Sequence, residues 1–176
     1  MRKEVLLLKK MNIVRFISIG GILTTIAVLF QSAPVFLPAI GMALSPLSTL
    51  PIALAAYLNI SLGITVLFSS VLILVFVSVQ EALILLCTTG LLGIVLGILY
   101  KKKLLVSILF TVLALSIGMI ILTYIIGISA FGDFTSSLSI PITILFFILF
   151  SLIYAIIWNI LLKKFILYLI KIKVLN

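Results

Sequence analysis

The sequence predicts an all-α integral membrane protein, a bundle of six transmembrane helices with both termini in the cytoplasm. Of its 176 residues, 65% are hydrophobic and 9% are charged, whereas soluble domains are about half apolar and about a quarter charged. The apolar runs are continuous rather than alternating, which favours helices over a membrane β-barrel. All 12 Lys and Arg residues fall in three clusters, namely Arg2, Lys3, Lys9, Lys10 and Arg15; Lys101, Lys102 and Lys103; and Lys163, Lys164, Lys171 and Lys173.

The spacing of these clusters predicts the number of spans. Basic residues flanking a span stay on the cytoplasmic side, so an even number of spans must separate each pair of clusters. A span needs about 20 apolar residues, so residues 16–100 hold four spans and residues 104–162 hold two. The net charge of +9 is then an orientation signal at helix ends, and no nucleic-acid partner is expected.

The first four spans are expected over residues 13–32, 37–58, 60–79 and 82–100. We expect the second of these to be broken, because Pro38, Pro46 and Pro51 interrupt it and proline removes a backbone donor and kinks a helix. Asn59 marks the turn that follows, and Gln80-Glu81 marks the next turn.

The last two spans are expected over residues 104–128 and 140–162. The connector between them is rich in Gly, Ser and Thr and contains Asp133, which is typical of an exposed loop. Residues 163–176 are expected to form a cytoplasmic or interfacial tail, or to extend the sixth helix. No clear small-x-small cleavage site precedes Pro34, so we interpret the first span as an uncleaved helix and the chain as a single transmembrane domain.

Five candidate ligand-binding residues lie on the expected outer side of the membrane. An ionisable residue at membrane depth suggests function, because burying its charge is costly. A carboxylate in the first turn of a helix also complements the helix dipole, so ligand contact and helix capping both stay open for Glu81. For Asp133, ligand contact and an ordinary solvated loop position both stay open. A broken helix is a common binding element in transporters, although a simple proline kink fits as well. The candidates are Gln31, Pro38, Gln80, Glu81 and Asp133.

No pattern in the sequence predicts catalysis. The chain has no His and a single Cys, Cys87, so His- or Cys-based nucleophilic and metal chemistry has no support. Glu81 and Asp133 are too few to form a metal site without such ligands. We therefore expect no enzymatic activity, no metal and no cofactor.

Small residues recur at four-residue spacing in two spans, where they allow another helix to approach closely. Internal packing and docking of a partner helix both remain open for them. Asn159 is expected to bond a neighbouring helix. The small-residue positions are Gly20, Gly21 and Thr24 in the first span and Thr89, Gly93 and Gly97 in the fourth.

This layout resembles the substrate-binding S components of energy-coupling factor (ECF) transporters, which are small bacterial membrane proteins with six helices and both termini inside. The similar stretches are a proline-containing outer connector, Leu50-Pro-Ile-Ala-Leu-Ala-Ala56, and Gly90-Leu-Leu-Gly-Ile-Val-Leu-Gly97 before a basic stop. The layout is also similar to a related uncharacterised bacterial six-helix family.

The resemblance implies a subunit of the bacterial cytoplasmic membrane that binds a vitamin-like or apolar substrate. A transmembrane scaffold and ATPase subunits would come from other chains. The family docks that scaffold through Ala-x-x-x-Ala in the first helix, whereas here the first span offers Gly20/Thr24 and Gly21/Thr25. The alternative is a non-transporting membrane scaffold or regulatory protein that acts through helix packing with a partner.

Overall fold

The computed structural model describes residues 12–128 and 139–171, and this part of the chain is helical without any strand. It contains six helices that are long and apolar enough to cross a membrane, which confirms the predicted fold class and number of spans. The placement of both termini in the cytoplasm stays a prediction. The spans run over Ile13–Phe36, Pro38–Leu58, Ile60–Val77, Val79–Leu99, Leu104–Ile125 and Ile140–Lys171.

The first span, α1 (Ile13–Phe36), continues a turn beyond the expected end at residue 32. Pro34 lies inside this last turn, where a proline lacks the backbone N–H and its ring crowds the carbonyl four residues back. The helix nevertheless persists, and Leu37 closes it by donating its backbone N–H to the Ala33 carbonyl at 2.8 Å.

The second span is broken around Pro46 as predicted. It comprises α2 (Pro38–Leu44), the 3₁₀ turn η2 (Ser45–Ser48) and α3 (Thr49–Leu58). Pro51, by contrast, lies in the first turn of α3 and does not interrupt that helix. Pro38 and Pro46 each stand at the start of their element, where a missing N–H costs least. A 3₁₀ turn forms i→i+3 backbone hydrogen bonds, so it continues backbone pairing where the chain departs from the α-helix.

The third and fourth spans are α4 (Ile60–Val77) and a composite helix of α5 (Val79–Ile84), the π-helical segment η3 (Leu85–Thr89) and α6 (Gly90–Leu99). The fourth span begins three residues earlier than expected. Ser78 caps it by accepting a hydrogen bond from the backbone N–H of Glu81 at 3.4 Å, so Gln80 and Glu81 lie in its first turn rather than in the preceding connection.

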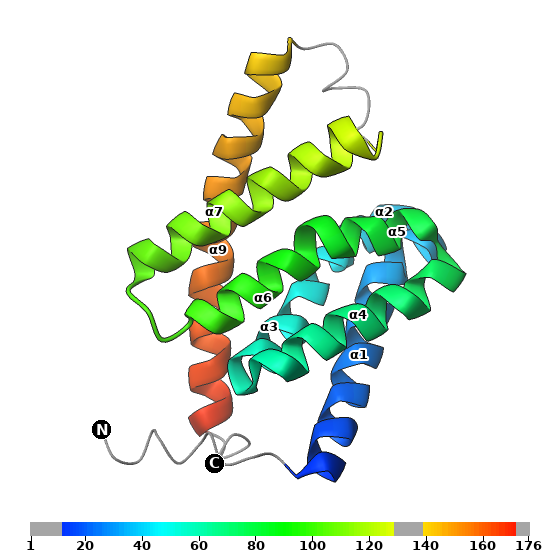
Figure 1. Ribbon diagram of the computed structural model, residues 1–176, viewed down its shortest axis with the longest axis vertical. Coiled ribbons are helices and arrows are strands. Elements are labelled where there is room, and N and C mark those ends of the chain that lie inside the picture. Colours follow the sequence, from blue (N-terminus) through cyan, green and yellow to red (C-terminus); the bar gives the residue numbers. More distant parts are fainter. Residues whose placement is uncertain (1–11, 129–138, 172–176) are drawn as a thin grey trace.

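The fifth span joins α7 (Leu104–Ile120) to a second π-helical segment, η4 (Ile121–Ile125), and the sixth is the 32-residue helix α9 (Ile140–Lys171). Of the two alternatives for residues 163–176, the helical extension holds as far as Lys171. Figure 1 shows α1 and α9 running along the long axis, with α4, α6 and α7 crossing obliquely between them. The start of α1 and the end of α9 lie at the same end of the molecule.

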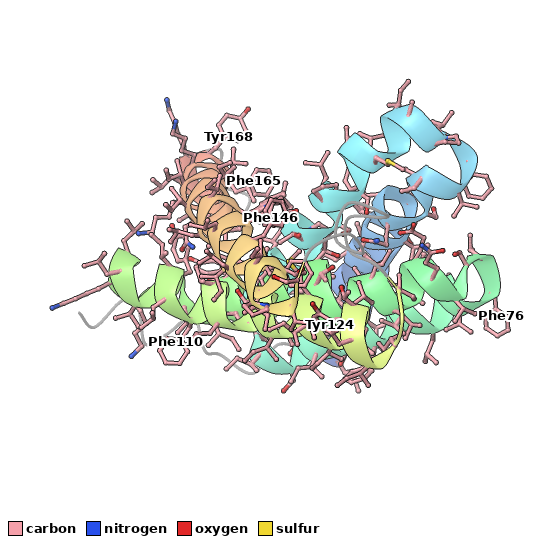
Figure 2. The ribbon with its side chains drawn as sticks, turned by 90° about the horizontal axis from the view of Figure 1, so that it is seen from above. Phe76, Phe110, Tyr124, Phe146, Phe165 and Tyr168 are labelled. Atoms are coloured by element: carbon pink, nitrogen blue, oxygen red, sulfur yellow. The ribbon has the colours of Figure 1, made fainter. Side chains whose placement is uncertain are left out.

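Two apolar clusters meet at α3 and hold the bundle together. One cluster joins α1, α3, α4 and α5 through residues such as Leu23, Ile52 and Val66, and the other joins α3, α6, α7 and α9 through residues such as Leu92 and Phe147. The outer surface is apolar as well: Phe76 is 92% exposed, and Figure 2 shows it pointing away from the helices. An apolar exterior around a packed interior fits a lipid environment.

Candidate functional site

A cavity of about 650 Å³ lies between the broken second span, the fourth span and the α7–α9 pair. This volume is within the range of about 300–1,000 Å³ that is typical of small-molecule sites. Seen from above in Figure 2, the α2 part of the second span (light blue) stands apart from α9 (orange), whereas α3 of the same span packs against α9. The lining residues are Pro34, Met42, Ser45, Pro46, Gln80, Glu81, Ile84, Thr88, Thr89, Leu115, Met119, Leu122, Phe150 and Tyr154.

A hydrogen-bonded cluster of four polar side chains is built into the wall of this cavity. Its centre is Gln31, whose side chain is fully buried in α1. The Gln31 Nε2 donates to Oε2 of Glu81 at 2.8 Å. The Gln31 Oε1 accepts from the hydroxyls of Ser48 at 2.8 Å and Thr89 at 3.1 Å. We call Gln31, Ser48, Glu81 and Thr89 the Gln31 cluster.

Three members of the Gln31 cluster sit where a helix begins, ends or changes type. Ser48 ends the 3₁₀ turn, Glu81 is in the first turn of α5, and Thr89 ends a π-helical segment, whereas Gln31 lies within the last third of α1. Interrupted helices of this kind are the elements that line sites in membrane proteins. The cluster therefore ties three of the six spans together at one edge of the cavity.

The orientation of the Gln31 amide follows from its partners. Both hydroxyls meet the oxygen, and the carboxylate, which only accepts when ionised, meets the nitrogen. Two donors saturate the lone pairs of Oε1, so this amide has no acceptor capacity left for a ligand. Leaving such a buried amide unpaired would cost about 1–3 kcal/mol, so the cluster holds Gln31 firmly in place.

The two π-helical segments both border the cavity. Thr88 and Thr89 line it from η3, and Leu122 lines it from η4. Next to them, a Cβ added at Gly118 of α7 would collide with the backbone carbonyl of Cys87. The fourth and fifth spans thus touch backbone to backbone here, and π-helical segments are often found at functional sites.

The opposite wall is apolar and aromatic. The rings of Phe150 and Tyr154 on α9 stack with centroids 5.5 Å apart, and Tyr154 lies 6.0 Å from the ring of Trp158. Met119 accepts a weak hydrogen bond from the Ser151 hydroxyl at 3.8 Å. Rings and thioethers offer an adaptable apolar surface to a small molecule.

Glu81 supplies the charge of the cavity. No Lys or Arg contributes to the described lining, and within residues 12–128 and 139–171 Glu81 forms no ion pair. The described basic residues near the bilayer ends, such as Arg15 and Lys163, belong to other parts of the bundle. The site therefore combines one acidic side chain with an apolar wall and contains no described basic residue.

The five predicted ligand-binding residues have different positions. Gln80 and Glu81 line the cavity, and Gln31 lies directly behind Glu81. Pro38 is exposed and does not contribute to the lining. Asp133 lies outside the described residues.

Sequence reasoning did not identify Ser48, or the aromatic wall of Phe150 and Tyr154, as parts of one site. Thr89 was predicted as a helix-packing residue, and it is also a hydrogen-bond donor to Gln31. No local signal in the sequence reveals these roles, because each partner comes from a different span.

The predicted packing positions fall into two groups. Gly93 and Gly97 let α6 lie against α3, since an added Cβ would be 2.9 Å from the Thr49 oxygen and 2.6 Å from the Ala56 Cβ respectively. Gly20 and Thr24 are buried. By contrast, Gly21 is exposed and has no neighbouring atom within 4 Å of such a Cβ.

Two further observations concern packing away from the cavity. Asn159 of α9 accepts a hydrogen bond from the Ser107 hydroxyl of α7 at 2.6 Å and donates to the Ala155 carbonyl at 2.8 Å, which confirms the predicted interhelical bond. A shallow groove of about 390 Å³ between α1 and α4 is lined by Phe16, Ile17, Gly20, Gly21, Thr24, Thr25, Thr65, Ser69 and Ile73.

Comparison of the chain with protein-family models, with curated proteins and with solved structures finds no match.

Proposed function

We propose that this protein is the membrane-embedded binding subunit of a transport system for a small organic molecule. The observation that carries the proposal is a ligand-sized cavity among six apolar helices, with the carboxylate of Glu81 held at its wall by Gln31. A half-buried carboxylate is costly at membrane depth, and such residues usually serve a substrate or ion. The proline-broken second span beside the cavity supports the same view.

The transport part of the proposal draws on the resemblance to ECF S components. The sequence has no phosphate-binding loop, so energy would come from ATPase subunits on other chains. In the topology expected from the basic clusters, Gln31 and Glu81 lie toward the outer side, and the cavity would receive its ligand from there in a bacterial cytoplasmic membrane.

Binding is tested with the full chain purified from its native membrane in mild detergent. Small molecules released from it are identified by mass spectrometry, and a labelled form of any such molecule is used to measure affinity. Leu115→Trp would fill the cavity from α7 and should abolish binding. Leu109→Trp on the same helix is the control, because Leu109 is 59% exposed and does not line the cavity.

The binding proposal fails if Leu115→Trp and the parent protein retain the same small molecule with the same affinity. It also fails if no small molecule is retained and no ATPase subunit accompanies the protein.

The second candidate function is a scaffold or regulator of a partner membrane protein. The observation that favours it is the open groove between α1 and α4, where Gly21 and Thr25 face outward at the four-residue spacing of close helix contacts. Gly21→Leu should then release a co-purifying protein without changing ligand retention. A partner that stays bound to Gly21→Leu and leaves with Leu115→Trp would contradict the scaffold role of this groove.

A further inference from the structure

We propose that the cavity takes an organic cation, an apolar molecule that carries a protonated amine. The inference rests on the proposed binding function and specifies the chemical class of its ligand. Three properties of the lining lead to it: the charge of Glu81, the direction in which the hydroxyl hydrogens point, and the aromatic wall.

The carboxylate of Glu81 presents a vacant acceptor. Gln31 occupies Oε2, and within the described residues no hydrogen-bond donor to Oε1 is present. No Lys or Arg of the described lining neutralises the charge. A ligand with a positive charge therefore gains a counter-ion, whereas an anionic ligand meets a like charge without compensation.

The two threonines that line the cavity together with Glu81 can also accept hydrogen bonds. A hydroxyl has one hydrogen to donate. Thr88 donates its hydrogen to the Ile84 carbonyl at 2.6 Å, and Thr89 donates its hydrogen to Gln31 at 3.1 Å. What both threonine side chains still offer is oxygen lone pairs, whereas the Gln80 amide and the Ser45 hydroxyl of the lining are neutral groups that can donate.

A protonated primary amine complements this edge because it has three N–H donors and no acceptor. Its N–H groups can donate to Oε1 of Glu81, and charge-assisted hydrogen bonds of this type are roughly twice as strong as neutral ones. A carboxylate or phosphate ligand would find only neutral donors in the described lining, such as the Gln80 amide and the Ser45 hydroxyl, and it would meet the like charge of Glu81.

The remaining lining suits the body of such a ligand. Phe150 and Tyr154 supply ring faces, which attract cations, and Met42 and Met119 supply deformable apolar contacts. The described residues contain no group of three or more metal-ligating side chains. These features favour an organic cation with an apolar body over a bare metal ion.

The test uses three probes that share the same apolar naphthyl group: the cation of naphthylmethylamine, the neutral alcohol naphthylmethanol and the carboxylate of naphthylacetic acid (naphthylacetate). Binding to the full-length protein in detergent is measured by equilibrium dialysis at neutral pH, and the Leu115→Trp protein in the same detergent provides the blank for partition into micelles. We expect the amine to bind about 10- to 100-fold more tightly than the alcohol, and the acetate to bind most weakly.

Two substitutions locate the preference. Glu81→Gln keeps the shape and removes the charge, so it should weaken amine binding about 10- to 100-fold and leave alcohol binding within about threefold. Thr88→Val should weaken amine binding about 3- to 10-fold through the lost acceptor. Thr65→Val is the matched control, because Thr65 likewise bonds its own helix, to the Ser61 carbonyl at 2.9 Å, but faces the groove instead of the cavity.

Equal affinity for amine and alcohol, or tightest binding of the acetate, would overturn the inference while the proposed binding function stands. If none of the three probes binds to the parent protein above the level of the Leu115→Trp blank, the result would count against both the inference and the proposed binding function. If Glu81→Gln does not fold, the ranking of the probes on the parent protein and the Thr88→Val comparison still decide the matter.

Discussion

Replacing Gln31 with leucine should destabilise the bundle more than any polar substitution on its surface. The change removes a hydrogen bond to an ionised group, worth about 1.5–3 kcal/mol, and two neutral bonds, worth about 1 kcal/mol each. Ser48 and Thr89 can redirect their hydroxyls to backbone carbonyls, and the buried leucine recovers part of the loss through apolar burial. The expected net cost is about 2–4 kcal/mol.

Cys87 makes this cost measurable. It is the single cysteine of the chain and is partly buried in η3, so a thiol-reactive fluorescent dye reports its exposure when the bundle melts. A loss of about 2–4 kcal/mol corresponds to a melting temperature about 5–15 °C lower. Thr25→Val is the control, since Thr25 is exposed on the same helix and its hydroxyl bonds only the Gly21 carbonyl at 3.0 Å.

A double-mutant cycle isolates the pair itself. Glu81→Leu alone leaves the Gln31 amide unsatisfied, whereas the combined Gln31→Leu and Glu81→Leu protein loses both partners together. The double variant should therefore be about 1–2 kcal/mol more stable than the sum of the single effects predicts. Strict additivity, or a Gln31→Leu protein that melts with the parent, would refute the role assigned to this hydrogen bond.

Three further predictions concern other parts of the bundle. Gly97→Ala should lower stability by about 1–3 kcal/mol because the added methyl meets the backbone of α3. Gly21 faces open space, so Gly21→Ala should leave the dye-based melting curve unchanged or shift it upward. A Gly21→Ala protein that melts at a lower temperature than the Gly97→Ala protein would contradict the packing described. Asn159→Leu should lower the melting temperature by several degrees through loss of the α7–α9 bond, and should leave amine binding unchanged in equilibrium dialysis. Reporter fusions after Lys103 and at the C-terminus should read cytoplasmic and a fusion near Asp133 external, and an external signal after Lys103 would reject the expected orientation.

The clustering of Lys and Arg was sufficient to predict six spans, because each apolar interval had to hold an even number of helices. The prolines likewise predicted the broken second span. Boundaries were less accurate: Pro34 did not end α1, and the cap at Ser78 starts the fourth span earlier. Whether a helix continues past a proline, or begins at a particular serine, depends on packing and on hydrogen-bond partners in the folded protein, and the sequence pattern does not show these.

The site was predictable in part. Gln31 and Glu81 stood out separately as polar residues near the expected outer face, but their pairing joins positions 50 residues apart. Thr89 lies at four-residue spacing from Gly93 and Gly97, which explains the packing role predicted for it. In the structure its hydroxyl also donates a hydrogen bond to Gln31 of another span. Contacts of this kind depend on how α1, η2 and the π-helical segment cross, and hydrophobic periodicity carries no information about crossing.

The length of α9 has a consequence for how the helix would move as a rigid body. Its 32 residues span ~48 Å, whereas the hydrocarbon layer is ~30 Å thick, so the last turns, with Lys163, Lys164 and Lys171, extend past it as a continuous rod. Phe150 and Tyr154 sit on the same rod at the cavity wall. In the proposed binding subunit, a rigid-body tilt of α9 that widens or narrows the cavity would therefore also displace this charged end.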